Sequence, residues 1–343
     1  MTRDSRLKHI LVIRFSAIGD VAMAAPVVRQ FAEQFPAIRF TMVSQPFLRP
    51  LFEGLPNLQF IGANVYVSYR GLRGLWRLFK VLRNQQPDVI ADIHNVLRSV
   101  ILRILFAGCG KRVYFIKKGL RAKKALTRRR RKKLRPLKTT VERYSDVLEK
   151  CVGAKLPPGM PYRPPAFKNS PGGIPEQAIG IAPFAKHRGK IYPLEQMEQV
   201  VAHFALARGT TVFLFGSASD SSILEQWEYR YFNVRTVAGR FSLYDELALM
   251  QQLSVMITMD SANMHLASFV GTPVVSVWGA THPYAGFYGW RQSPDNAIGA
   301  ALPCRPCAVF GNKPCRWGNY LCLRSIKPKQ IIDAVDLVMS RES

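Results

Sequence analysis

Residues able to bind an anion follow an apolar run in the C-terminal half of the chain. Val255–Met259 has the composition of a buried strand, and Asp260-Ser261 directly after it is typical of the start of a helix, here Ala262–Val270. A second apolar strand, Val274–Trp278, follows a Gly-Thr-Pro turn. Strand, helix and strand make a βαβ unit, so the turn after the first strand lies at the carboxyl end of a parallel strand.

Open α/β sheets bind ligands at that end, because the free N–H groups and the dipole of the helix point toward an anion. Asp260, Ser261 and His265 all lie within reach of this turn. The pattern therefore predicts a phosphate pocket. The alternative is that Asp260 and Ser261 only cap the helix and that His265 packs against the sheet.

Another carboxylate occupies the same kind of position near the N-terminus. His9–Phe15 predicts a strand and Val21–Phe35 a helix, and Gly19 between them permits a tight turn. Asp20 is expected to cap this helix and to face the crevice at the strand end. Arg14 is either a residue of that site or a surface charge.

Together these segments resemble glycosyltransferase family 9, the ADP-heptose:lipopolysaccharide heptosyltransferases. The resemblance covers nearly the whole chain, with its motifs in order. The motifs that carry it are Arg14-x-Ser16-x-x-Gly19-Asp20, Thr139-Thr140-Val141-Glu142-Arg143-Tyr144, Lys190-Ile191-Tyr192-Pro193, Asp260-Ser261-x-x-Met264-His265-Leu266-Ala267 and Gly279-x-Thr281-x-Pro283. The resemblance implies the α/β GT-B architecture, in which two Rossmann-like domains face a cleft.

The resemblance also implies roles for single residues. Asp20 matches the family's catalytic base, which would take the acceptor hydroxyl proton as the oxygen attacks the anomeric carbon opposite the diphosphate and inverts it. Lys190 and His265, with the helix N-terminus, would hold the diphosphate. The donor-binding residues expected are Lys190, Gly216, Asp260, Ser261, Ala262 and His265. Asp260 would hold sugar hydroxyls or orient the turn, and Gly216 would line the nucleoside pocket.

The donor site is expected to work without a metal. No Asp-x-Asp motif of a metal-dependent transferase occurs, so cationic side chains and the helix dipole would stabilise the leaving group, and no cofactor is expected. Thr236–Leu243 contains no acidic residue that could grip the ribose hydroxyls. ADP-heptose is the donor that the resemblance implies, and another nucleotide sugar is the alternative.

The chain has six cysteines, of which four form a C-x2-C-x7-C-x6-C cluster similar to that of the second heptosyltransferase type. Such a cluster could bind a structural zinc ion, and a loop of reduced thiols is the equal alternative. A catalytic metal is not expected here, because no carboxylate or histidine accompanies the thiols. The clustered residues are Cys304, Cys307, Cys315 and Cys322.

The formal net charge of +27 is unevenly distributed. No acidic residue occurs between Asp92 and Glu142, and residues 117–138, the basic arm, contain most of the cations of that stretch. Such a segment indicates an anionic partner, and the acceptor implied by the resemblance, the lipid A–inner core of lipopolysaccharide, lies in an anionic membrane. Its central cations are Arg128, Arg129, Arg130, Arg131, Lys132 and Lys133. A solvated loop without a role is the alternative, and no nucleic acid is expected, because aromatic residues do not interleave the cations.

Alternating strand and helix patterns divide the chain in two. Residues 1–156 would form the acceptor-binding domain with the basic arm, residues 157–177 a proline- and glycine-rich linker, and residues 178–325 the nucleotide-sugar domain. Residues 326–343 form the C-terminal segment, in which Lys329–Met339 has helical periodicity, and this segment could return to the first domain.

The expected protein is an inverting heptosyltransferase of the cytoplasm that associates with the inner face of the cytoplasmic membrane. No apolar run approaches the roughly 20 residues of a membrane span, and the polar N-terminus does not resemble a signal peptide. A rival from another class is a basic nucleic-acid-binding α/β protein without catalysis, whose binding would fall steeply with salt.

Overall fold

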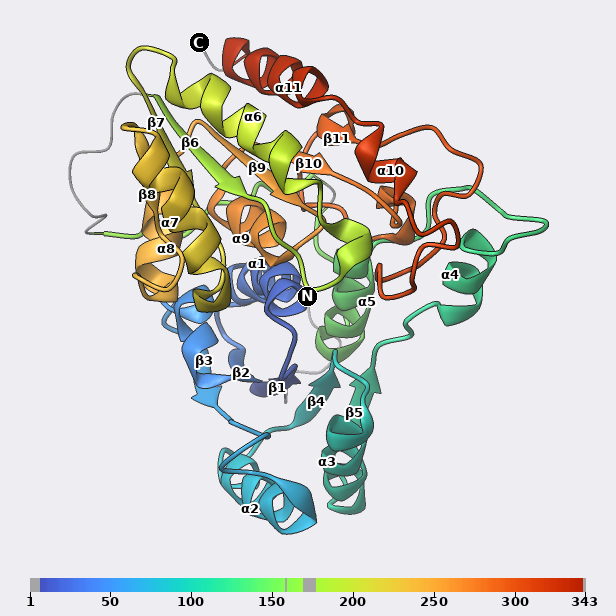
Figure 1. Ribbon diagram of the computed structural model, residues 1–343. Helices are drawn as coiled ribbons and strands as arrows, with labels where there is room; N and C mark the ends of the chain where they lie inside the picture. The colour runs from blue at the N-terminus through green and yellow to red at the C-terminus, as the bar shows by residue number, and fades with distance from the viewer. Residues whose placement is uncertain (1–6, 158, 169–176, 342–343) are drawn as a thin grey trace. The chain divides into compact units, whose positions relative to one another are not determined.

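The computed structural model describes residues 7–157, 159–168 and 177–341. The chain separates into two compact units: Met1–Lys118 with Thr140–Pro165, and Gly119–Thr139 with Ala166–Ser343. Residue 158 and residues 169–176 of the expected linker lie outside the described residues, as do residues 1–6 and 342–343. Each unit is an α/β layer structure, which confirms the expected fold class (Figure 1).

The first unit contains a five-stranded parallel sheet in the order β3-β2-β1-β4-β5. Its strands are β1 (His9–Ile13), β2 (Arg39–Ser44), β3 (Leu58–Gly62), β4 (Val89–Asp92) and β5 (Arg112–Phe115). Its helices are α1 (Ile18–Gln34), the 3-10 helix η1 (Pro46–Phe52), α2 (Gly71–Arg83), α3 (Leu97–Gly108) and α5 (Thr140–Val152). All of β1 is buried, as expected for a strand covered on both faces.

The side chains of successive residues in β1 point to opposite faces of this sheet. Leu11 and Ile13 pack in a core with Leu78 of α2 and Leu102 of α3. Helices α1 and α5 pack against each other away from this core. The strand is therefore fixed from both sides, and the first turn of α1, which carries Asp20, starts from a rigid base.

The second unit contains a six-stranded parallel sheet in the order β11-β10-β9-β6-β7-β8. Its strands are β6 (Gln177–Ala182), β7 (Thr210–Leu214), β8 (Val234–Thr236), β9 (Val255–Met259), β10 (Val274–Val277) and β11 (Ala297–Ile298). Its helices are α4 (Leu120–Leu126), α6 (Leu194–Ala205), α7 (Ser221–Arg230), α8 (Leu243–Met250), α9 (Ala262–Val270), α10 (Leu321–Arg324) and α11 (Pro328–Ser340). Its short 3-10 helices are η2 (Arg188–Lys190), η3 (Ala218–Asp220), η4 (Pro283–Ala285) and η5 (Pro294–Asn296).

Two parts of the chain differ from the expected domain division. Most of the basic arm belongs to the second unit, although the strand before it and the helix after it belong to the first. The physical reason is local packing: Leu126 is fully buried, and the Nζ of Lys123 lies 3.9 Å from the ring centroid of Phe287. The main-chain N–H of Leu137 also donates to Tyr284 O at 3.0 Å.

The C-terminal helix is the other difference. Helix α11 packs beside α6 over strands β9 and β10, and Ile331 and Val335 are buried in the core of the second unit (Figure 1). The apolar side chains of α11 thus complete the second unit's own core. Among the described residues, no helix is long and apolar enough to cross a membrane.

Candidate active site

The order of strands places one end of the second sheet at a topological switch point. From β6 the chain proceeds outward through β7 and β8, whereas β9, on the other side of β6, leads to β10 and β11. The loops that leave β6 and β9 therefore diverge from a shared edge. Open α/β sheets bind ligands in this crevice.

Lys190 and Asp260, which come from these two loops, form a buried ion pair. The Lys190 Nζ lies 2.9 Å from Asp260 Oδ2, and the two side chains are 15% and 4% exposed. Seventy residues separate the pair along the chain, and the adjacency of β6 and β9 brings them together. Two of the residues expected to bind the donor thus share one site.

The turn that carries Lys190 is positioned by a close approach of two backbones. The N–H of Ala280 donates to Gly189 O at 2.8 Å. A Cβ on Gly279 would lie 2.5 Å from that same oxygen and 2.6 Å from Leu323 Cγ. Only glycine fits at position 279, and the close packing that results holds η2, which ends at Lys190, against the loop after β10.

Helix α9 begins at Ala262, two residues after Asp260, and has the bounds that the sequence predicts. Ser261 occupies the N-cap position, but its side chain does not bond the helix N–H groups; its Oγ lies 3.1 Å from Thr258 Oγ1. The first N–H groups, starting at Ala262, are thus left to an incoming anion. His265 is buried on α9 one turn later, on the same face as Ser261.

Gly216 lies after β7, the strand beyond β6. A Cβ there would approach Leu224 Cδ1 to 3.1 Å and Asp220 Cβ to 3.3 Å, so the turn is tight. The carboxylate of Asp220 accepts the N–H of Ser217 at 2.8 Å. Asp220, four residues after Gly216, thus closes this turn.

In the first unit, Asp20 pairs with Arg14 and does not cap a helix. Ala17 is the N-cap of α1, and Asp20 lies in its first turn. Arg14 Nη2 lies 2.7 Å from Asp20 Oδ2, with the two side chains 7% and 32% exposed. Arg14 also donates from Nη1 to Ile93 O at 2.8 Å, and its guanidinium lies 5.4 Å from the Tyr144 ring centroid. The cap expectation was wrong because a buried arginine, fixed at the end of β1, competes for the carboxylate.

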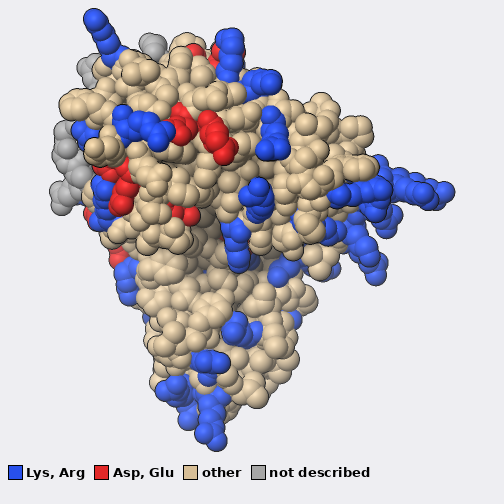
Figure 2. All heavy atoms as spheres, viewed as in Figure 1, with Lys and Arg blue, Asp and Glu red and all other residues tan. Residues whose placement is uncertain are grey.

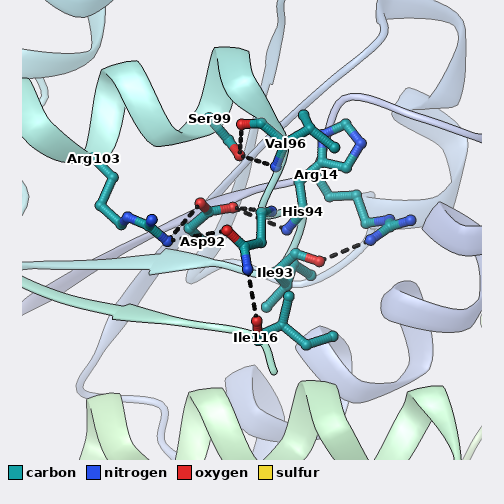
Figure 3. Close-up of polar contacts among 9 residues, drawn as sticks. Arg14, Asp92, Ile93, His94, Val96, Ser99, Arg103 and Ile116 are labelled. Carbon is teal, nitrogen blue, oxygen red and sulfur yellow. Dashed lines mark hydrogen bonds and ion pairs between the residues drawn. The ribbon is translucent and has the colours of Figure 1, made fainter. Parts of the chain in front are cut away.

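The end of β4 and the loop after it supply polar groups that the sequence reasoning missed (Figure 3). Asp92 is fully buried; its Oδ1 accepts the N–H groups of His94 and Asn95 at 3.0 and 2.7 Å, and Arg103 Nη1 lies 3.4 Å from its Oδ2. The signal was the polar residues Asp92, His94 and Asn95 at the end of a buried strand.

His94 is held neutral at this point. Its Nδ1 accepts the N–H of Phe15 at 3.3 Å, which assigns the proton to Nε2. Burial, reinforced by the nearby charges of Arg14 and Lys118, lowers the pKa of His94 to about 3. Burial and Arg14 also lower the pKa of Lys118, an effect opposed by Asp20 and Asp92. Strands β1 and β4 flank the first unit's own switch point, so these groups lie where a ligand is expected.

The remaining expected residues lie in two other places. Arg128–Arg131 and Lys133 are exposed on the basic arm, and in Figure 2 Lys and Arg side chains project from this segment. Lys132 instead donates to Pro303 O and Arg305 O at 3.0 and 2.8 Å.

All four clustered cysteines are free thiols, and burial raises the pKa of the Cys322 thiol to about 11. Within the described ranges no group of three or more His, Cys, Asp or Glu side chains is arranged to hold a metal ion.

Comparisons with known proteins place this arrangement in a family. The lipopolysaccharide core heptosyltransferase OpsX of Haemophilus influenzae is 23% identical over 301 residues, which cover 85% of this chain and 83% of that protein. The structure of E. coli ADP-heptose lps heptosyltransferase II matches with a TM-score of 0.70 at 18% identity, covering 98% of this chain and 99% of that one. A family 9 glycosyl transferase from Veillonella parvula matches with a TM-score of 0.75 at 19% identity, covering 99% and 100%.

The sequence model of glycosyltransferase family 9 (heptosyltransferase) matches residues 75–318, most of the chain. This stretch includes the Lys190–Asp260 pair and the start of α9. The chain therefore belongs to glycosyltransferase family 9.

Proposed function

We propose that this glycosyltransferase transfers a heptose from ADP-heptose to the inner core of lipopolysaccharide, with inversion and without a metal ion. The observation that carries the proposal is the buried Lys190–Asp260 pair beside the uncapped start of α9. At this place an ammonium group, free helix N–H groups and the positive end of the helix dipole can all interact with a diphosphate. The similarity to OpsX, named for lipopolysaccharide core, and to the ADP-heptose enzyme of E. coli supports this donor and acceptor.

Lys190 is assigned to the departing diphosphate. As the bond between the anomeric carbon and the phosphate oxygen breaks, negative charge develops on that oxygen, and preorganised donors stabilise it. The Asp260 carboxylate beside the ammonium fixes its position and offers its other oxygen to a sugar hydroxyl. The Lys190 ammonium and the N-terminus of α9 thus stabilise the negative charge that a metal ion stabilises in metal-dependent transferases.

Asp20 is assigned as the base. The acceptor oxygen forms the new bond to the anomeric carbon, and its proton passes to the Asp20 carboxylate. Arg14 engages Oδ2 of Asp20, and Oδ1 is the oxygen that we assign to the acceptor hydroxyl. Neutral His94, whose ring abuts Phe15, adds no competing charge at this point.

The exposed cations of the basic arm are assigned to the anionic surface that carries the acceptor. Polybasic segments gain about 1 kcal/mol per Lys or Arg near an anionic leaflet. We propose that the enzyme works in the cytoplasm as a peripheral protein on the inner face of the cytoplasmic membrane.

A panel of nucleotide sugars tests the donor and acceptor together. Purified protein is incubated with ADP-, GDP- or UDP-activated sugars and a deacylated lipid A–inner core acceptor, and products are identified by mass spectrometry and NMR. Transfer from ADP-heptose alone, with an inverted anomeric centre and unchanged rate in EDTA, is the expected result. Preference for a GDP- or UDP-sugar would refute the donor, and loss of activity in EDTA that magnesium restores would refute the metal-free assignment.

A further inference from the structure

Helix α2 exposes apolar side chains among its cations. Its inner face, which includes Leu78 and Phe79, is buried in the core of the first unit. Its outer face carries Leu72 and Trp76, which are 72% and 47% exposed. The Lys80 Nζ lies 5.8 Å from the Trp76 ring centroid. An exposed Leu and Trp on one helix cost solubility unless they have a partner.

Helix α3, which packs against α2, continues the same surface. Leu97 and Ile104 on it are 76% and 62% exposed. A groove of about 730 Å³ is lined by residues of both helices. Its apolar lining includes Leu72, Trp76, Ile101 and Leu105, and Arg73 and Arg77 line it as well.

The charge around this groove has one sign. Residues 54–87 contain no Asp or Glu, whereas α2 contains Arg73, Arg77, Lys80 and Arg83. The next two acidic residues do not oppose these cations: Asp88 accepts the N–H groups of Lys8 and His9, and Asp92 is fully buried. Where Figure 2 shows the surface over α2, blue side chains stand among tan ones and no red one is visible.

We infer that the outer surface of α2 and α3, the docking face, inserts into the interfacial layer of an anionic lipid bilayer. Trp favours the depth of the headgroups, Leu and Ile favour the acyl boundary, and arginines pair with lipid phosphates. The docking face belongs to the first unit, whereas most cations of the basic arm belong to the second, so each unit would have its own membrane contact. The biological sense of the inference rests on the proposed lipid-borne acceptor, but its test does not.

Flotation with lipid vesicles tests the docking face. The variant Leu72→Ser/Leu97→Ser/Ile104→Ser is compared with the parent on vesicles of phosphatidylcholine with phosphatidylglycerol. We expect its partition coefficient to fall about tenfold or more, since three apolar side chains lose their burial in lipid. The residual binding of the variant should disappear in high salt, whereas the parent keeps a salt-resistant fraction. The matched control, Leu206→Ser/Tyr229→Ser/Phe232→Ser, replaces three comparably exposed side chains of the second unit and should bind as the parent does.

Trp76 provides a direct readout of insertion. Brominated acyl chains should quench the parent's fluorescence on anionic vesicles, and Trp76→Phe should remove most of that quenching. Trp317→Phe is the control, because Trp317 is 65% exposed but lies far along the chain in the second unit. Quenching that persists without Trp76, or a triple variant that partitions as the parent does, would overturn the inference. So would a parent dimer that the triple variant dissociates, because the docking face would then be occupied by a second copy of the chain.

The same variants separate this inference from the proposed function. Transfer to the soluble, deacylated acceptor should be unchanged in the triple variant, because the replaced side chains lie outside the assigned catalytic groups. Failure of the parent in that assay would refute the proposed function and leave the vesicle result standing.

Discussion

At the scale of single residues, Asp20 carries the sharpest prediction. Asp20→Asn keeps the size of the side chain but cannot accept the acceptor proton. Turnover should fall about 10²-fold or more, which is the usual contribution of a positioned base, while ADP affinity stays near the parent value. Initial rates at saturating acceptor and calorimetric ADP binding check both parts. A variant that turns over as fast as the parent would remove Asp20 from the mechanism.

Variants of the Lys190–Asp260 pair distinguish its contribution to folding stability from its contribution to ADP binding. Lys190→Ala leaves the buried Asp260 carboxylate without its cation, so the free energy of unfolding should fall by about 3 kcal/mol. The double variant Lys190→Ala/Asp260→Asn should recover part of that stability, because the buried charge is gone. ADP affinity should remain low in both, since the ammonium group is absent. Urea unfolding and calorimetry measure the two effects, and recovery of ADP binding in the double variant would contradict the assigned role of Lys190.

His94 gives the molecule a defined response to pH. Its folded pKa of about 3 lies below the ordinary value of 6.5, so the unfolded chain takes up the proton first as pH falls. The folded state therefore loses stability from about pH 6.5 downward, by about 1.4 kcal/mol per unit. The difference in unfolding free energy between the parent and His94→Asn should shrink by about 2 kcal/mol between about pH 7.5 and about pH 5. A pH-independent difference would show that His94 is not held neutral in the folded state.

At the scale of elements, Gly279 fixes where the turn η2 lies. In Gly279→Ala the new Cβ would meet Gly189 O and Leu323 Cγ, so η2 must move and Lys190 with it. We expect a loss of about 1–3 kcal/mol in stability, as for other overpacked sites, together with weaker ADP binding. Gly108→Ala in α3 is the control, because a Cβ there meets nothing within 4 Å. Equal ADP affinity in parent and Gly279→Ala would mean that η2 is not positioned by this contact.

Elements with strong local signals could be predicted from the sequence. Strand β9 and helix α9 have the predicted bounds, because an apolar run, a helix-starting Asp-Ser and a Gly-Thr-Pro stop all agree. Strand β3 was not predicted, since Leu58 is its one buried residue and the apolar signal of the strand is weak. The two-residue strand β11 is too short to leave a pattern.

The sequence was enough to name residues of the site, but it could not show which of these residues contact one another. Lys190 and Asp260 were both named from motifs, but their pairing depends on β6 and β9 being neighbours, which no local pattern reports. Asp20 was expected to cap the helix after the Gly19 turn, but in the structure its carboxylate pairs with the buried Arg14. The catalytic and donor-binding roles themselves stay predictions until the variants are measured.

At the scale of the whole molecule, the net charge of +27 makes binding to anionic lipid depend on salt. Replacing Arg128–Arg131 and Lys133 with Gln removes five exposed cations from the basic arm and leaves Lys132 on its two carbonyl partners. Vesicle binding should weaken most at low ionic strength, and the KM for a lipid-borne acceptor should rise while the KM for the nucleotide sugar stays constant.

The control for this experiment keeps the net charge equal. It replaces five exposed cations outside the basic arm with Gln: Arg208, Arg291, Arg324, Lys327 and Arg341. If both variants lose vesicle binding equally, total charge and not the basic arm determines membrane attraction.

The packing of α4 on the second unit has a consequence for how the polypeptide can be divided. The chain passes between the units three times, after Lys118, after Thr139 and after Pro165. A single protease cut in the proline-rich stretch would therefore leave the two units joined through the ends of the 119–139 segment. A fragment that begins at Ala166 would also lack Leu126 and Lys123, side chains that its own interior surrounds. Dissection of this enzyme into separately expressed halves therefore requires a rearranged gene in which residues 140–165 are excised and residues 119–139 are joined directly to the second half.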